Sequence, residues 1–234
     1  MRKSVPADMR GGIGPKLYVA WATLAVGGSI ALAGLTAESV TRLLVLGFLG
    51  AQLVFRESLA AALPSLAPRA RFVVMGTLLA AVVEGFHMIS TPVFPSLRVG
   101  RGTPPLQALE SFALDLLFTV PAYLVIFSVI CFFVSRYRYG TWAYVVVMGF
   151  AQAIGDGGLF FFASAPAMLV FLPYPMTNYH AVNVLPFLAV RGQLDPERPS
   201  SARSWLVVPA VVGTYLVCGA LIKVAGRWSG LEPR

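Results

Sequence analysis

The sequence has few charged residues, which excludes most classes of soluble protein. Only 12% of its 234 residues are charged, 57% are hydrophobic and the mean hydropathy is +0.76. These values are far from those of soluble globular domains, so the composition excludes a soluble enzyme, a disordered chain, a coiled coil and a nucleic-acid-binding protein. We therefore interpret the net charge of +8 as a signal of membrane topology rather than of a polyanionic partner.

Cysteine and histidine are also scarce, with two of each. Cys131 and Cys218 lie in apolar runs at expected depths of about 5 and 21 Å from the inner face, so we expect no disulfide. His87 and His180 are expected at about 10 and 21 Å from the outer face, which is too different for two ligands of one haem iron. Because no other ligands occur at a fixed spacing, we expect no metal ion and no cofactor.

Seven apolar stretches are each long enough to cross a bilayer, which takes about 20 residues of helix. They cover residues 17–35, 41–63, 71–94, 105–134, 142–163, 166–190 and 204–226. Pro166, Pro173 and Pro175 interrupt the sixth stretch, so we expect a broken or re-entrant segment there, with Thr177 and Asn178 capping a new helix start. The sequence predicts an all-helical integral membrane protein with one domain over residues 1–234.

The basic residues between these stretches predict the orientation. If the N-terminus is cytoplasmic, eleven basic residues lie inside and five outside, as the positive-inside rule requires. We therefore expect a cytoplasmic N-terminus in a bacterial inner membrane or the endoplasmic reticulum. The inner set is Arg2, Lys3, Arg10, Lys16, Arg69, Arg71, Arg136, Arg138, Arg191, Arg198 and Arg203, and the outer set is Arg42, Arg98, Arg101, Arg227 and Arg234.

Five ionisable residues from three successive predicted spans converge on one layer of the membrane. At 1.5 Å per residue, they fall about 8–15 Å from the outer face, and each costs about 2.5–3.5 kcal/mol to insert. One or two would fit hydrogen bonds between helices, whereas five favour a lined cavity. The five are Glu84, His87, Glu110, Asp115 and Asp156. Glu110 and Asp115 point about 140° apart on their helix, so we expect one of them to contact a neighbouring helix.

Several short motifs carry a further signal. They are Ala81-Val82-Val83-Glu84-Gly85-Phe86, Leu109-Glu110-Ser111, Gln152-Ala153-Ile154-Gly155-Asp156 with Phe160, and Asn183-Val184-Leu185 after Tyr174-Pro175. These motifs are similar to those of the EXPERA-domain family, which includes sterol Δ8–Δ7 isomerases of the emopamil-binding type and relatives such as the sigma-2 receptor. The resemblance covers about residues 41–190 and implies a five-helix core with one extra helix at each end.

The resemblance implies roles for four of these residues. Glu84 and Glu110 match the two acids that handle protons in the isomerases, while Asp156 and Asn183 match further family positions. The chain departs from the family at Ala80, where the isomerases have a histidine one turn before the first glutamate. It also departs at Pro186, which falls near the position of their cavity tryptophan.

The predicted function is acid–base chemistry on a sterol or other terpenoid, by a double-bond isomerase or a carbocation-forming cyclase or hydratase. Such chemistry needs an acid and a base in a dry pocket. We expect a hydrophobic small molecule or lipid as the partner, and a homodimer is left open. The expected catalytic residues are Glu84 and Glu110, supported by His87, Asp115, Asp156 and Asn183.

Three other functional classes stay open at this point. One is a sterol- or lipid-binding protein of the same fold without catalysis. The second is an intramembrane aspartyl protease, for which Asp115 and Asp156 would have to share one proton. The third is a proton-coupled transporter, because buried carboxylates also mark proton relays, although the sequence shows no inverted repeat.

Overall fold

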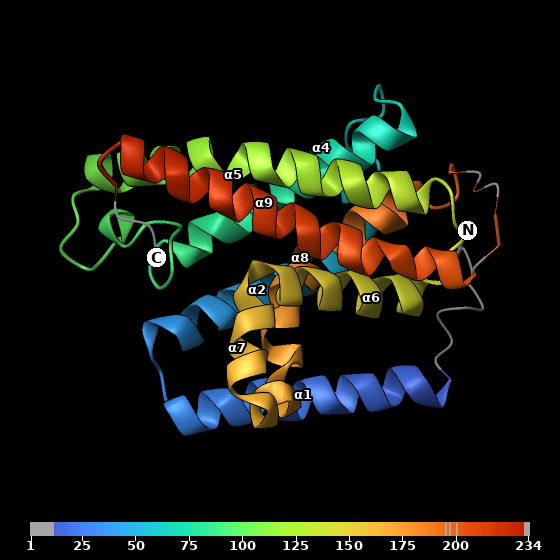
Figure 1. Cartoon of the computed structure of the whole chain (residues 1–234), viewed down its shortest axis with the longest axis horizontal. Helices are drawn as coiled ribbons and strands as arrows, with labels where there is room; N and C mark the ends of the chain where they lie inside the picture. The colour runs from blue at the N-terminus through green and yellow to red at the C-terminus, as the bar shows by residue number, and fades with distance from the viewer. Residues whose placement is uncertain (1–11, 195, 197, 200, 232–234) are drawn as a thin grey trace.

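The computed structural model describes residues 12–194, 196, 198–199 and 201–231. Within these ranges the chain is built from helices, and its one β-bridge joins Tyr137 to Arg198. The elements (Figure 1) are α1 (Ile13–Ala33), α2 (Ala37–Val54), α3 (Arg56–Ala60), α4 (Pro68–His87), η2 (Pro95–Leu97), α5 (Pro105–Val134), α6 (Thr141–Ala153), η3 (Ile154–Gly158), α7 (Leu159–Ser164), η4 (Pro166–Phe171), α8 (Pro173–Val190), η5 (Ala202–Leu206) and α9 (Val207–Trp228).

Six helical segments of the described chain are long and apolar enough to cross a membrane. They are Ile13–Ala33, Ala37–Val54, Pro68–His87, Pro105–Val134, Thr141–Ser164 and Ala202–Trp228. The prediction of an all-helical, multi-pass membrane protein is therefore confirmed. Arg2, Lys3, Arg10 and Arg234, which contribute to the predicted orientation, lie outside the described residues.

The sixth predicted span, 166–190, is divided into two elements. The 3-10 segment η4 ends at Phe171, and α8 begins at Pro173, which has no backbone N–H and suits the first turn of a helix. Because α8 begins there, Thr177 and Asn178 lie inside the helix and do not cap it as predicted. Their side chains instead contact α2.

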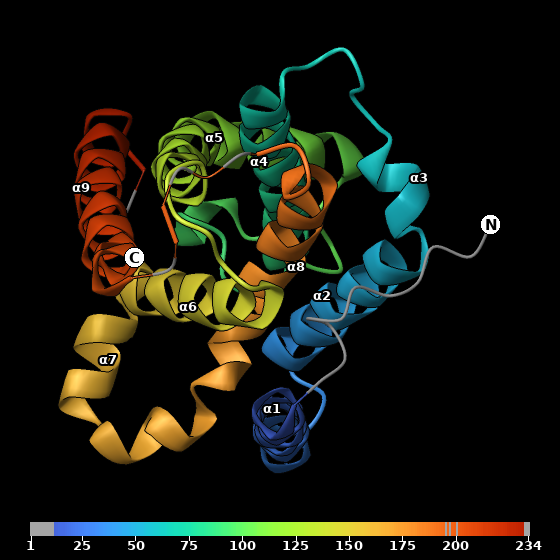
Figure 2. The same cartoon turned by 90° about the vertical axis from the view of Figure 1, so that its right-hand side faces the viewer.

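Helix α8 forms the centre of the bundle, between α2, α4 and α6 (Figure 2). Thirteen of its 18 residues are buried. Because the helix faces protein on most sides, it carries polar residues that a lipid-facing helix would not tolerate. This explains why α8 is not among the six apolar segments, although it lies deep in the bundle.

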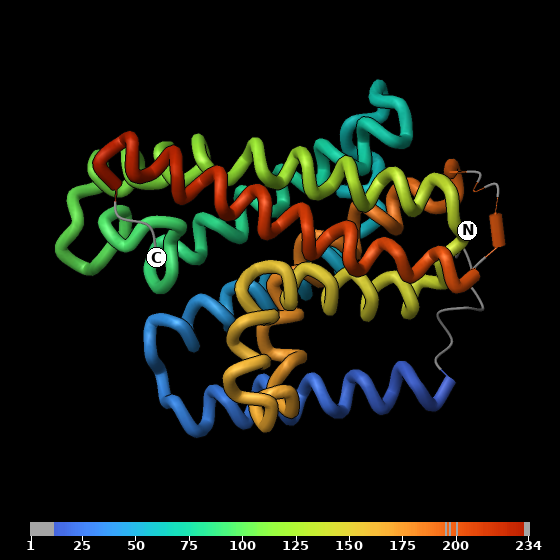
Figure 3. Tube along the Cα trace, in the orientation of Figure 1, coloured from blue at the N-terminus to red at the C-terminus, as the bar shows by residue number. Residues whose placement is uncertain are grey.

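Helix α1 lies at one side of the molecule (Figures 1 and 3). It packs mainly against α8 and η4. Two hydrogen bonds attach it. Tyr18 bonds to the buried His180 on α8, and the Trp21 indole N–H donates to the carbonyl of Val170 at 2.7 Å. The segment of α7 and η4 forms an arch that leads from the end of α6 to the start of α8 (Figure 2).

The arch begins at a π-helical turn, η3, that ends α6. Asp156 has φ −83° and ψ 48°, and Gly157 has φ +91°, a left-handed conformation that glycine adopts without a steric penalty. The α-helical hydrogen-bonding pattern is therefore interrupted at Asp156. Such interruptions are frequent at functional sites.

Candidate functional site

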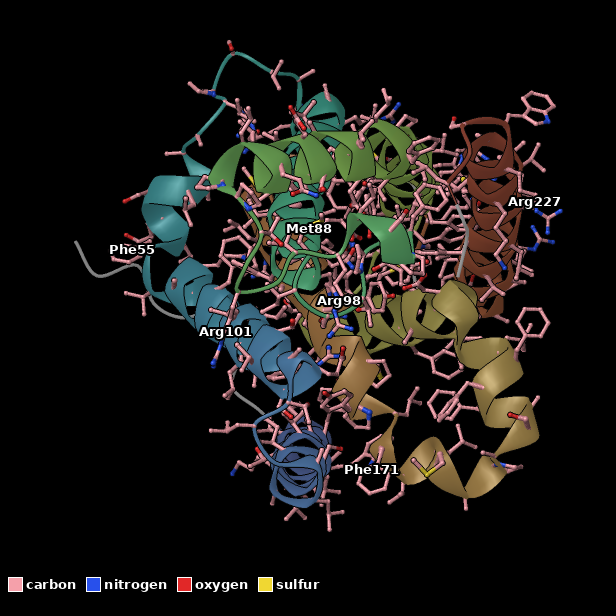
Figure 4. All side chains as sticks on the ribbon, turned by 90° about the vertical axis from the view of Figure 1, so that its left-hand side faces the viewer. Phe55, Met88, Arg98, Arg101, Phe171 and Arg227 are labelled. Atoms are coloured by element: carbon pink, nitrogen blue, oxygen red, sulfur yellow. The ribbon has the colours of Figure 1, made fainter. Side chains whose placement is uncertain are left out.

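A cavity of about 1100 Å³ lies between the bundle, α1 and the arch. This volume is at the upper end of the usual range of small-molecule sites. Phe161, Phe162, Met168 and Phe171 contribute an apolar wall from the arch, and Phe171 lies beside α1 (Figure 4). The polar residues on the cavity are Ser29, Thr36, Glu38, Ser39, Arg42, Glu84, His87, Thr91, Thr119, Tyr123, Asp156, Tyr174, Asn178, Tyr179 and Tyr215.

Glu84 lies on α4 and accepts a hydrogen bond from the Tyr123 hydroxyl on α5. The two helices approach closely because Gly76 on α4 leaves room for the Phe127 ring, which would lie 2.5 Å from a Cβ at that position. Tyr123 lies one turn before Phe127 and therefore shares its helix face. Close packing of α4 on α5 thus places the phenol at the carboxylate.

Asp156 lies on the π-helical turn and accepts a hydrogen bond from the Tyr179 hydroxyl on α8 at 2.5 Å. The preceding residue, Gly155, packs against Tyr215 of α9, where a Cβ would lie only 2.8 Å from the Tyr215 Cβ. The turn is therefore held between α8 and α9, and its carboxylate faces the cavity.

A third phenol lies beside these two pairs. The rings of Tyr179 and Tyr215 meet edge to face, with centroids 6.2 Å apart, and all three phenols line the same cavity as the two carboxylates. The buried Tyr215 hydroxyl has no hydrogen-bond partner among the described residues. We refer to Glu84, Asp156, Tyr123, Tyr179 and Tyr215 as the acid–tyrosine cluster.

His87 also lines the cavity, one turn after Glu84 on α4, and its Nδ1 lies 2.9 Å from the Thr91 hydroxyl. Its imidazole also lies near Arg42, Glu38, Asp156 and the side chain of Asn178. By contrast, Ala80 is 1% exposed and packs in the hydrophobic core. The family resemblance implies a histidine one turn before Glu84, at Ala80, whereas the histidine of α4 comes one turn after it, at His87.

Glu110 does not lie on this cavity, which corrects the prediction that it lines one cavity with Glu84 as a catalytic residue. Its side chain is exposed, and it is not among the lining residues. The cavity side of α5 carries Thr119, Ala122 and Tyr123, and Glu110 is nine residues before Thr119, about 180° around the helix. The rotation of α5 thus directs Glu110 away from the site.

Asp115 and Asn183 are buried but also lie off the cavity lining. Asp115 accepts a hydrogen bond from the Val93 backbone N–H at 2.9 Å, which attaches the loop after α4 to α5. The Asn183 amide donates to Gln152 on α6 and to the Tyr179 carbonyl on its own helix. Both predicted supporting residues therefore hold the scaffold together and do not face a ligand.

The same placement bears on the aspartyl protease alternative. Asp156 faces the cavity and bonds to Tyr179, whereas Asp115 is fully buried against Val93. An aspartate dyad needs two carboxyl groups on one substrate site. The geometry therefore gives this alternative no support.

Arg42 was predicted to lie in an outer loop, but it is 3% exposed and lines the cavity. Its Nη1 donates to the Thr177 hydroxyl at 3.1 Å and to Asn178 Oδ1 at 2.5 Å, and its Nη2 bonds to Glu38 at 3.1 Å. The guanidinium also lies 4.1 Å from the ring centroid of Tyr174. We refer to Glu38, Arg42, Tyr174, Thr177 and Asn178 as the arginine cluster.

The arginine cluster was missed because the predicted span began at residue 41, which left Arg42 at its edge. The helix begins four residues earlier, where Thr36 caps α2 by accepting a hydrogen bond from the Ser39 N–H. A threonine cap followed by Glu38 and Arg42, four residues apart, is a helix-start pattern. Reading that pattern would have placed Arg42 inside the helix.

No known protein family, no curated protein and no solved structure matches the chain.

Proposed function

We propose that the protein is a membrane-embedded acid–base enzyme that acts on a hydrophobic isoprenoid, either a sterol or another terpenoid. One observation carries this proposal: Glu84 and Asp156 lie on the wall of one large cavity, and each is hydrogen-bonded to a tyrosine. Of the four residues to which the resemblance gives a role, Glu84 and Asp156 line the cavity, so we assign to Asp156 the role that Glu110 was expected to fill.

A carbon–carbon double bond moves when a proton is added to one alkene carbon and another is lost from a neighbouring carbon. One carboxylic acid gives its proton, the π electrons form the new C–H bond, and the cation is left on the adjacent carbon. The second carboxylate then removes a proton, and the electrons of that C–H bond form the new double bond. The number of protons and electrons is unchanged, so no oxidant or reductant is consumed.

The three tyrosines support this chemistry in two ways. Aromatic faces attract cations electrostatically, so the rings of Tyr123, Tyr179 and Tyr215 offer stabilisation to a carbocation where the family has a tryptophan. Hydrogen bonds from Tyr123 and Tyr179 hold the two carboxylates in place. If a second double bond or a water captures the cation, the same site catalyses cyclisation or hydration.

We also propose that the N-terminus faces the cytoplasm. Segments that carry predicted inner arginines meet at one end of the bundle: Arg138 bonds to the Arg198 backbone, and Arg191 bonds to Thr141. Glu84 and His87 lie at the opposite end of α4 from Arg69 and Arg71. In this orientation the cavity opens in the outer half of the membrane.

The test is turnover by the purified protein in lipid nanodiscs. A Δ8-sterol, geranylgeraniol and squalene are incubated separately, and the products are identified by gas chromatography and mass spectrometry. We expect an isomerised or cyclised product with the wild type and none with Glu84→Gln. A protein that binds one of these compounds tightly but converts none of them is a binding protein, which would contradict the proposal.

A further inference from the structure

The arginine cluster is a second polar region on the cavity, separate from the acid–tyrosine cluster. A guanidinium has five N–H donors, and Arg42 uses three of them on Thr177, Asn178 and Glu38. Its Nε is buried and has no hydrogen-bond partner among the described residues. An unfilled donor on a buried arginine at membrane depth is costly. A ligand that offers an acceptor to the Arg42 Nε would remove this cost.

The neighbouring carboxylate lacks a donor. Glu38 accepts from Arg42 through Oε1, while Oε2 is buried and has no partner within the described chain. The Glu38 side chain is 38% exposed, so its carboxylate has room to rotate toward a ligand. An unfilled donor and an unfilled acceptor thus lie within one ion pair on the cavity wall.

The charge of the cavity disfavours an anionic ligand. Among the described lining residues, the carboxyl groups of Glu38, Glu84 and Asp156 outnumber the single guanidinium of Arg42. A phosphate or carboxylate would gain one attraction, but the Glu38 carboxylate and at least one of the other two carboxylates would repel it in a medium of low dielectric constant. A neutral group that both accepts and donates fits the two unfilled atoms, and a hydroxyl is the smallest such group.

We propose that the arginine cluster binds the hydroxyl group of an isoprenoid alcohol. Arg42 donates a hydrogen bond to the hydroxyl oxygen, and Glu38 accepts a hydrogen bond from the O–H. The rest of the molecule then extends through the apolar cavity toward the acid–tyrosine cluster. The isoprenoid identity of the ligand rests on the proposed function, whereas the preference for a hydroxyl rests on the arginine cluster alone.

The experiment compares ligands that share one C20 chain and differ only in the polar end. Geranylgeraniol, its methyl ether, its monophosphate and the matching hydrocarbon compete with labelled geranylgeraniol for the wild-type protein in nanodiscs. The ether keeps the acceptor oxygen but cannot donate. We expect the alcohol to bind about tenfold more tightly than the ether, as for one lost buried hydrogen bond, and the phosphate to bind more weakly than the alcohol.

Two variants locate the preference. Glu38→Gln changes a half-exposed side chain and should reduce the difference between alcohol and ether to about twofold or less. Arg42→Lys should reduce the difference between ether and hydrocarbon, although Arg42 also joins α2 to α8 and its loss affects folding. Glu57→Gln, an exposed acid on α3, is the matched control and should keep the wild-type order.

Tighter binding of the phosphate, equal binding of alcohol and hydrocarbon, or an undiminished affinity ratio between alcohol and ether in a folded Glu38→Gln variant would each overturn this inference. The competition measures binding without turnover. A preserved alcohol preference without any product would therefore contradict the proposed function and leave the hydroxyl site standing, and a product without the preference would do the reverse.

Discussion

The hydroxyl of Tyr123 on α5 donates a hydrogen bond to the carboxylate of Glu84 on α4, at the wall of the cavity. The bond joins two helices and directs the carboxylate toward the space that a ligand would fill. Asp156 and Tyr179 form a second bond of the same kind between the π-helical turn and α8. The proposed chemistry depends on these two carboxyl groups.

Replacing Glu84 by glutamine should abolish catalysis without unfolding the protein. The amide still accepts the bond from Tyr123 but cannot exchange a proton, and general acid–base groups contribute about 10²–10⁴-fold to rate. The control is Glu110→Gln, an exposed glutamate off the cavity, which should keep wild-type turnover. Equal losses in both variants would show that the site has been misplaced.

Tyr123→Phe should lower the free energy of unfolding modestly, because it removes the hydrogen bond from Tyr123 to Glu84. Hydrogen bonds between membrane helices contribute about 0.6 kcal/mol on average. A double-mutant cycle with Glu84→Ala, which removes the acceptor, should therefore give a coupling energy of that order when the free energy of unfolding is measured in mixed micelles. A coupling energy near zero would mean that the contact does not stabilise the fold.

Gly157→Ala should damage the site through the backbone. Gly157 has φ +91°, where an L residue costs about 1–2 kcal/mol, and the strain would move the adjacent Asp156. Gly213→Ala on α9, where a Cβ meets open space, should be neutral or stabilising because alanine favours helix. Thermal denaturation and turnover are measured for both variants. Equal melting temperatures and equal turnover of Gly157→Ala and Gly213→Ala would contradict this prediction.

Asp115→Ala should loosen the loop after α4. The substitution removes the acceptor of the Val93 N–H, and an unpaired buried donor costs about 1–3 kcal/mol. Hydrogen exchange of the Val93 amide should accelerate, whereas Asp115→Asn keeps an acceptor and should largely preserve protection. Slow exchange in the alanine variant would show that another group holds the loop.

Helix depth could be predicted from the sequence because every residue adds the same rise. That arithmetic placed five residues in one layer, of which Glu84, His87 and Asp156 line the cavity and Glu110 and Asp115 do not. The break in the segment 166–190 could also be predicted, because a proline lacks the backbone N–H and its ring clashes with the preceding turn of a helix.

Helix rotation could not be predicted for α5. Leu117 and Leu124 face outward while Ile126 and Ile130 are buried, so apolar residues occur on every side of the helix. Lipid is as apolar as the protein core, and periodicity therefore does not say which face packs. This is why Glu110 was assigned to the cavity although it faces away.

The arginine cluster was missed for a related reason. Arg42 was taken as a boundary of a span because an isolated arginine is expensive inside a membrane. Its partners Thr177 and Asn178 lie 135 and 136 residues away in sequence, so no local pattern shows that they meet it. Only the packing of α8 on α2 reveals that the charge is satisfied.

Incorporation of deuterium from heavy water into a bound isoprenoid tests most directly whether Glu84 and Asp156 exchange protons with the ligand. The wild-type protein in nanodiscs is incubated in D₂O with a compound shown to bind, and carbon-bound deuterium is measured by mass spectrometry and NMR. We expect deuterium beside the double bond with the wild type and with Glu110→Gln, and at least about a hundredfold less with Glu84→Gln or Asp156→Asn. Tight binding by the wild-type protein without carbon-bound deuterium would contradict acid–base catalysis at this site.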